Sequence, residues 1–133
     1  GAMKRYPPSI RNSFGFGNDA SSQTGNYGCL CMKVTALESV IEFIDTLEIP
    51  VKTDVRRLTA LLEEYGHELS MPYSKPIGNG LWELRRKGRP QIRILYGFCR
   101  GEAILVLGFK KQRSALRPQD VALARKRFAA YCA

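Results

Sequence analysis

The sequence predicts an α+β domain, with two N-terminal helices packed on a small, mainly antiparallel sheet of three to four strands and a C-terminal helix. Three observations support this class. Apolar residues recur at helical spacing in two stretches before Gly66, short apolar or alternating runs follow between residues 81 and 109, and Pro118 begins a third helical stretch. The 133 residues, 44% of them hydrophobic, fit one globular domain.

The composition divides the chain at residue 31. We interpret residues 1–31 as a tag remnant followed by a Gly-, Ser- and Asn-rich N-terminal arm, and residues 32–133 as the folded domain. The two residues before Met3 are typical of those that remain when a protease removes a tag. Because Met32 is a second candidate start, it stays open whether the arm is functional.

Two helices are expected at the start of the domain. The first is predicted within residues 34–47, where Thr35 and Glu38 have the spacing of a capping box. The second is predicted over about residues 53–65, after a break at Pro50. Their apolar stripes are Leu37, Val40, Ile41, Ile44 and Leu47 in the first helix, and Val55, Leu58, Leu61, Leu62 and Tyr65 in the second.

A sheet is expected in the second half of the chain. Residues 67–80, with two prolines and two glycines, are predicted to form a loop. Strands are predicted over 81–86, 91–98 and 103–109, because the first two alternate and the third is apolar on both faces. A short strand near 28–34 is expected to join the sheet edge.

The last helix is predicted to begin at Pro118, since proline is favoured in the first helical turn. Its core-facing residues are expected to be Val121, Ala124, Phe128 and Tyr131, and its outward residues Arg125, Lys126 and Arg127.

Positive charge is concentrated in the C-terminal part of the chain. The whole chain has a net charge of +9, and residues 81–133 alone hold 13 Lys or Arg against 3 Asp or Glu, a net +10. Residues 33–70 hold 4 basic and 8 acidic residues, a net −4. Segregation of charge of this kind favours a polyanionic partner, and nucleic acid is the first candidate.

The cysteine and histidine residues offer little for a metal site. Cys29 and Cys31 are one residue apart, which is not the spacing of a zinc ribbon, and His67 is the only histidine. We therefore predict no metal and no cofactor. The thiols are expected to be reduced in a cytoplasmic protein, because the sequence shows neither a signal peptide nor the about 20 consecutive apolar residues of a membrane span.

Basic residues are expected to converge on one face of the sheet. Strand alternation places Arg85 and Arg93 on the same side of adjacent strands, and either Lys110 or Lys111 must point to that side. Such a cluster can hold an RNA backbone, or stabilise the negative charge that develops when the RNA 2′-hydroxyl attacks its own phosphate. The residues predicted to bind RNA around it are Phe109, through base stacking, and Arg113, Arg86 and Lys87.

The general base of such a reaction stays open. His67 is expected to be an exposed loop residue, and Tyr96 is expected in the core, as is Trp82. A lysine whose pKa is lowered by neighbouring cations is a further candidate.

Three stretches, GLWELR, IRILYGF and LGFKKQRSALRPQD, together resemble the RelE/ParE toxin superfamily, and most closely its HigB-type, phage-related branch. The resemblance extends in order from residue 33 to about residue 131. It implies a RelE-like fold and the toxin of a type II toxin–antitoxin system. The implied activity is that of a ribosome-dependent mRNA endoribonuclease that blocks translation. By position, the catalytic residues would be Arg85, Arg93, Lys110 and Lys111.

The resemblance also implies partners. These are the ribosome with its mRNA and a cognate HigA-type antitoxin that carries a helix-turn-helix domain. Whether the protein also forms a homodimer is left open. Leu107 stands where many relatives have histidine. Two alternatives remain: a ParE-like inhibitor of DNA gyrase, and a non-catalytic nucleic-acid- or antitoxin-binding protein of the same fold. The retained Arg93 and Lys110–Lys111 favour the nuclease.

Overall fold

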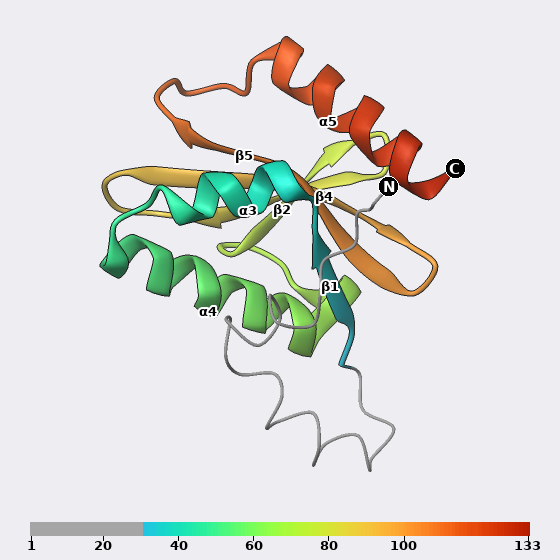
Figure 1. Cartoon of the computed structure of the whole chain (residues 1–133), viewed down its shortest axis with the longest axis horizontal. Coiled ribbons are helices and arrows are strands. Elements are labelled where there is room, and N and C mark those ends of the chain that lie inside the picture. Colours follow the sequence, from blue (N-terminus) through green and yellow to red (C-terminus); the bar gives the residue numbers. More distant parts are fainter. Residues whose placement is uncertain (1–30) are drawn as a thin grey trace.

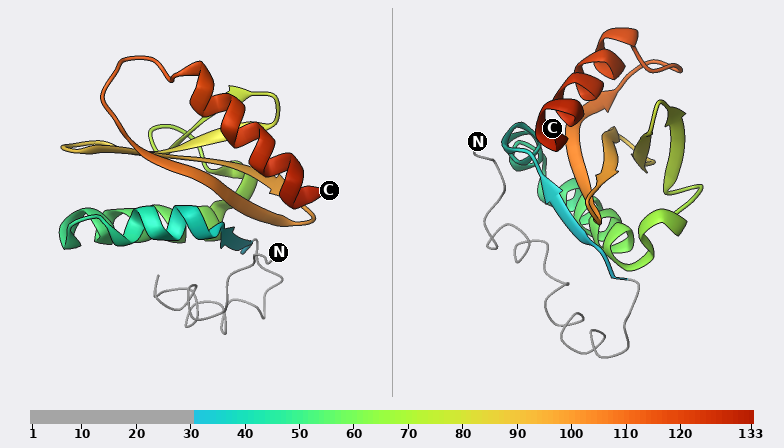
Figure 2. Two further views of the ribbon diagram at one scale, coloured as in Figure 1. Left: turned by 45° about the horizontal axis from the view of Figure 1, so that its top comes forward. Right: turned by 90° about the vertical axis from the view of Figure 1, so that its right-hand side faces the viewer.

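A computed structural model describes residues 31–133, and in them a five-stranded sheet has helices on both faces. Helices α3 and α4 cover one face, and α5 covers the other (Figures 1 and 2). The predicted α+β class is confirmed, but the sheet has more strands than the three to four predicted. The elements are β1 (Lys33–Ala36), α3 (Glu38–Asp45), α4 (Ile49–Tyr65), the 3₁₀ helix η2 (Gly66–Glu68), β2 (Ser74–Gly78), β3 (Leu81–Arg86), β4 (Gln91–Cys99), β5 (Glu102–Lys111) and α5 (Pro118–Cys132).

The strand order is β1-β5-β4-β3-β2, with β1 parallel to β5 and every other pair antiparallel. The central strands β3, β4 and β5 lie where the sequence predicts them. The two edge strands differ more from prediction. β2 lies inside the predicted loop, and Pro76 fits there because an edge strand tolerates a missing N–H. The expected edge strand near residues 28–34 is β1, although residues before 31 lie outside the described part.

Both N-terminal helices begin differently from prediction. Thr35 belongs to β1, and its hydroxyl donates a hydrogen bond to Glu102 at 2.6 Å. The predicted capping box is therefore wrong, and α3 begins after Leu37 without a side-chain cap. α4 begins at Ile49, earlier than predicted, because Pro50 lies in its first turn, where no intrahelical N–H bond is needed.

The helices approach the sheet closely at two glycines. A Cβ on Gly97 of β4 would lie 2.7 Å from the Phe128 ring of α5, and one on Gly108 of β5 would lie 2.6 Å from the Phe43 ring of α3. Each ring thus packs directly on a strand backbone. The core between the sheet and α3–α4 is the larger of the two, and a smaller cluster lies under α5.

Helix α5 begins at Pro118 as predicted, but only Ala124 in it is fully buried. Arg127, expected to face solvent, donates a hydrogen bond to the Val106 carbonyl at 3.0 Å. Cys99 and Cys132 form a disulfide between the end of β4 and the end of α5. The prediction of reduced thiols is therefore wrong for this pair.

Within residues 31–133, none of the helices is long and apolar enough to cross a membrane.

Candidate nucleic-acid interface

An open groove of about 780 Å³ lies between the β3–β4 turn and the segment that follows β5. Among the described residues that line it, seven of eleven are Lys or Arg and none is acidic. The concentrated positive charge of residues 81–133 therefore has a definite place in the fold, and it is suited to a polyanion. The seven cations, which we call the groove cations, are Arg85, Lys87, Arg89, Arg93, Lys110, Lys111 and Arg113.

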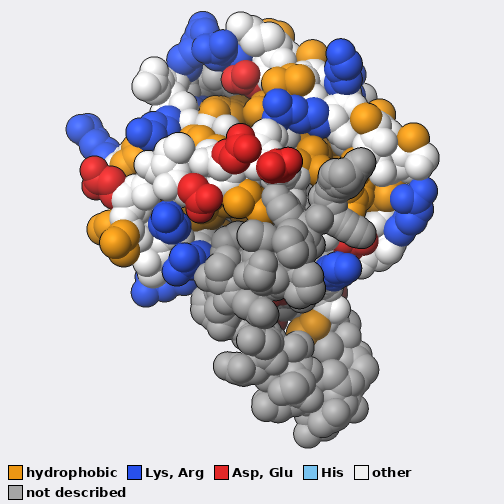
Figure 3. Space-filling view, in the orientation of Figure 1, with side chains coloured by type: hydrophobic (Ala, Val, Ile, Leu, Met, Phe, Trp, Pro, Cys, Tyr) orange, Lys and Arg blue, Asp and Glu red, His pale blue; other side chains and the backbone are white. Residues whose placement is uncertain are grey.

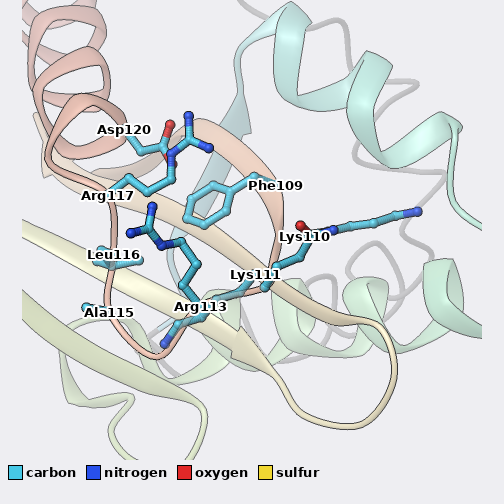
Figure 4. A pocket seen from close by; sticks show the side chains of 9 residues that line it. Phe109, Lys110, Lys111, Arg113, Ala115, Leu116, Arg117 and Asp120 are labelled. Atoms are coloured by element: carbon cyan, nitrogen blue, oxygen red, sulfur yellow. The ribbon is translucent and has the colours of Figure 1, made fainter.

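Strand register determines which cations share a face. Arg85 pairs directly with Arg93 across β3 and β4, as the sequence predicts, and Arg93 pairs with Phe109 of β5. Since alternate residues of a strand share a face, Lys111 lies on the Arg85–Arg93 side and Lys110 on the other. Figure 4 shows the Lys110 side chain extending away from the other labelled cations. Lys111 is therefore the lysine that joins the arginine pair.

Glu83 lies at the centre of this face, and the sequence analysis assigned it no role. Its side chain is 3% exposed; one carboxylate oxygen is 3.2 Å from Arg93 Nε and the other is 3.9 Å from Arg85 Nε. The alternation of β3 already places Glu83 on the same side as Arg85. Its carboxylate reduces the repulsion between two arginines that face each other across the strands.

Most of the Arg93 guanidinium is held by hydrogen bonds within the protein, and its Nε forms an ion pair with Glu83. The residue is 2% exposed. Nη1 donates to the carbonyls of Arg86 and Ile92, at 3.0 and 3.1 Å, and Nη2 donates to the Gln91 side chain at 3.0 Å. Burial lowers the pKa of Arg93, while the charge of Glu83 opposes this shift. Arg93 therefore orders the face of the sheet rather than extending into the groove.

Arg85 and Lys111 are both more accessible than Arg93. Arg85 Nε has no hydrogen-bond partner among the described residues, and Nη1 lies 3.2 Å from the Met71 sulfur. Burial lowers the pKa of the Lys111 ammonium, and the positive charges of Arg93, Arg85 and Lys75 lower it further, against the opposing effect of Glu83. Lys75 was missed because its strand, β2, was predicted to be a loop.

The remaining predicted RNA-binding residues are divided between the two faces. Lys87 and Arg113 are exposed and line the groove, together with Arg89, which the sequence analysis did not single out. Arg86 lies on the opposite face, where its Nη2 is 2.9 Å from Asp54 of α4 and its Nη1 donates to the Pro90 carbonyl. The structure does not bring Arg86 into the groove.

The aromatic and histidine candidates for the base lie outside the groove. Tyr96 is 1% exposed, and its hydroxyl is 2.5 Å from that of Ser74. The exposed His67 ring packs on Phe98, with 3.9 Å between ring centres, on the α3–α4 face of the sheet. Trp82 packs edge-on against Phe98, as expected for a core residue. The groove instead offers Lys111 as an ionisable group with a lowered pKa.

A second, smaller pocket of about 260 Å³ adjoins the groove at the end of β5 (Figure 4). It is bounded by the end of β5, the segment that follows, and the first turn of α5. Phe109 forms part of its wall, half-buried, and packs against the apolar cluster under α5. Its lining residues are Phe109, Lys110, Lys111, Gln112, Arg113, Ala115, Leu116, Arg117 and Asp120.

The chain matches one protein family over most of the described domain. The model of the family described as "Phage derived protein Gp49-like (DUF891)" matches residues 42–129, a range that contains all the groove cations and the residues of the smaller pocket. No curated protein is significantly similar to the chain.

Proposed function

Since the chain belongs to the Gp49-like family of phage-derived proteins, we propose that it is the toxin of a toxin–antitoxin pair and cleaves mRNA on the ribosome. The observation that carries the proposal is the groove, in which seven cations and no acidic side chain occur among the described lining residues. The phosphate backbone of RNA is the ligand that such a surface favours. The resemblance of three stretches to HigB-type toxins supports the same activity.

The proposed reaction uses the substrate's own nucleophile. The 2′-oxygen attacks the adjacent phosphorus, and the bond from phosphorus to the 5′-oxygen breaks, which leaves a 2′,3′-cyclic phosphate and a 5′-hydroxyl. Arg85 lines the groove and its side chain is 16% exposed, so it stabilises the extra negative charge on the phosphate oxygens. In this scheme the Lys111 amine, with its lowered pKa, takes the 2′-hydroxyl proton, and water protonates the leaving 5′-oxygen.

Arg93 and Glu83 are positioning residues in this scheme. Arg93 binds two backbone carbonyls and Glu83, so its charge is held in place beside Arg85 at the wall of the groove. Glu83 lies near both arginines and reduces the repulsion between them. Replacing Arg93 would leave the buried Glu83 without its nearer partner, and a loss of activity would then be hard to separate from a loss of folding. Replacing Lys111 therefore tests the mechanism more directly than replacing Arg93.

The partners follow from the same proposal. A HigA-type antitoxin with a helix-turn-helix domain would neutralise the toxin, and the ribosome would present the mRNA. The basic groove supports the second partner more directly, since it is suited to a single strand held by its phosphates.

The test is a cell-free translation reaction with primer extension on the message. We compare the unaltered protein with Lys111→Met, which removes the charge and keeps the apolar stem, and with Lys126→Met, the same change at an exposed α5 position that does not line the groove. We expect cuts within the translated frame that require ribosomes, persist in Lys126→Met, and fall at least about 100-fold in Lys111→Met, the lower range for loss of a general base.

An intact message in the presence of the unaltered protein would overturn the nuclease. If translation also continues, the result would favour inhibition of DNA gyrase, or binding without catalysis. Equal cutting by both lysine variants would leave the nuclease in place and remove Lys111 from its mechanism.

A further inference from the structure

The smaller pocket differs chemically from the groove that it adjoins. Both cavities are lined by Lys110, Lys111, Gln112 and Arg113, so they are continuous at the end of β5. The pocket, however, also contains an aromatic ring and a carboxylate, which the described lining of the groove lacks. A ligand with a phosphate in the groove can therefore place a different chemical group in the pocket.

The aromatic ring of the pocket is Phe109. Phe109 pairs with Arg93 of β4, and its ring packs against the apolar cluster under α5, so its position is determined by the sheet. In Figure 4 the ring lies among the side chains of Arg117, Arg113 and Lys111. A half-buried aromatic ring beside cations is the arrangement on which unpaired nucleobases stack.

The carboxylate of the pocket is Asp120, in the first turn of α5. Its side chain is 21% exposed, and one of its oxygens lies 3.6 Å from Arg117 Nε. A carboxylate accepts hydrogen bonds and donates none, so it repels a phosphate but binds a group with N–H donors. Among the nucleobases, guanine presents two adjacent donors, N1–H and the N2 amino group, which match the two oxygens of one carboxylate.

We infer that this pocket binds one unpaired guanine of the RNA strand held in the groove, with the base stacked on Phe109 and its Watson–Crick edge directed to Asp120. The inference rests on the proposed function and gives the site a base preference. A volume of about 260 Å³ is just below the roughly 300–1,000 Å³ of pockets for drug-sized ligands, as expected for a single base. Adenine and cytosine offer one donor group on that edge and fit the carboxylate less well.

The experiment measures the binding of short oligouridylates that carry one central guanosine, adenosine or cytidine. Their sugars are 2′-fluorinated, so that no 2′-hydroxyl is present to attack, and fluorescence anisotropy at low salt gives the dissociation constants. We expect the full chain to bind the guanosine oligomer at least about fivefold more tightly than the other two, the lower range for a bidentate base contact.

Two variants separate base recognition from charge. Asp120→Asn removes the carboxylate, and Asp45→Asn makes the same charge change at an exposed position on α3. We expect the guanosine preference to fall to about twofold or less in Asp120→Asn and to be unchanged in Asp45→Asn. Each variant loses one negative charge, so both should bind all oligomers somewhat more tightly. The ratio of the dissociation constants for the different oligomers is therefore the quantity that tests base recognition. Circular dichroism confirms that each variant is folded.

The outcomes distinguish this inference from the proposed function. Tight, salt-sensitive binding of all oligomers without base preference would overturn the guanine pocket and leave the basic groove as an RNA site. A guanosine preference that persists in Asp120→Asn would overturn the role of Asp120. Failure of the unaltered protein to bind any oligomer at low salt would overturn the guanine pocket together with the proposed function.

Discussion

Arg85 and Arg93 show that residues of like chemistry in the groove have different tasks. Arg93 and Arg85 face each other in register, yet the Arg93 side chain is 3% exposed and bonded to backbone carbonyls, whereas the Arg85 side chain is 16% exposed. Glu83 also lies nearer to Arg93, at 3.2 Å, than to Arg85, at 3.9 Å. One arginine thus supports the face of the sheet, and the other remains for the ligand.

At the residue scale we predict that Glu83→Gln lowers the free energy of unfolding by about 3–5 kcal/mol, because it leaves two arginines without their buried counter-charge. Urea denaturation followed by circular dichroism measures the change. Glu64→Gln, at an exposed position on α4, is the control and should change the free energy by no more than about 0.5 kcal/mol. A Glu83→Gln protein as stable as this control would mean that the pair contributes nothing net to folding.

Of the three α-helices in the described part of the chain, α5 has the fewest buried residues. Only Ala124 of α5 is fully buried, and the helix is held further by Phe128 against the Gly97 backbone and by the disulfide at Cys132. Its first turn nevertheless provides Asp120 to the smaller pocket. The geometry of that pocket therefore depends on how α5 is docked on the sheet.

At the element scale we predict that Gly97→Ala destabilises the protein by about 1–3 kcal/mol, because the added methyl group would lie 2.7 Å from the Phe128 ring and would displace α5. Thermal denaturation of four proteins measures the effect: unaltered, Gly97→Ala, Phe128→Leu and the double variant. A smaller side chain at position 128 should remove part of the clash, so Gly97→Ala should cost less in the Phe128→Leu background. An equal cost in both backgrounds would refute the close contact as its cause.

At the scale of the whole molecule, seven of the 21 basic residues of the chain line one groove. In the view of Figure 3, basic and acidic side chains both occur, in small separate groups. The groove differs because its described lining contains cations without acidic residues. Three strands (β3, β4 and β5), the turn between β3 and β4 and the segment after β5 supply these cations, so the surface exists only when the sheet is assembled.

The corresponding prediction concerns salt. The logarithm of the RNA association constant should fall linearly with the logarithm of salt concentration, with a slope of about −0.7 for each phosphate neutralised on a single strand. Lys87→Met removes one exposed groove cation and should reduce the magnitude of the slope by about 0.7. Lys126→Met removes a cation that does not line the groove and should leave the slope unchanged. Anisotropy titrations over a salt series measure both, and identical slopes for the two variants would place the RNA elsewhere.

Much of the architecture could be predicted because it is encoded locally. Strands β3, β4 and β5, the start of α5 and the pairing of Arg85 with Arg93 follow from alternation and from turns a few residues away. The groove cations were predicted for the same reason, apart from Arg89. The catalytic roles of Arg85, Arg93, Lys110 and Lys111 stay predictions, as do the antitoxin and the ribosome as partners.

The sequence by itself thus determined the α+β class, the central strands and the concentration of charge, since these depend on periodicity and composition over short stretches. Tertiary structure decided which residues meet across long separations. It placed β1 parallel to β5, made an edge strand of the segment around Pro76, paired Arg86 with Asp54 and joined Cys99 to Cys132. It also decided that Lys111 rather than Lys110 faces the arginines, because that choice depends on the register of three strands packed between two layers of helices.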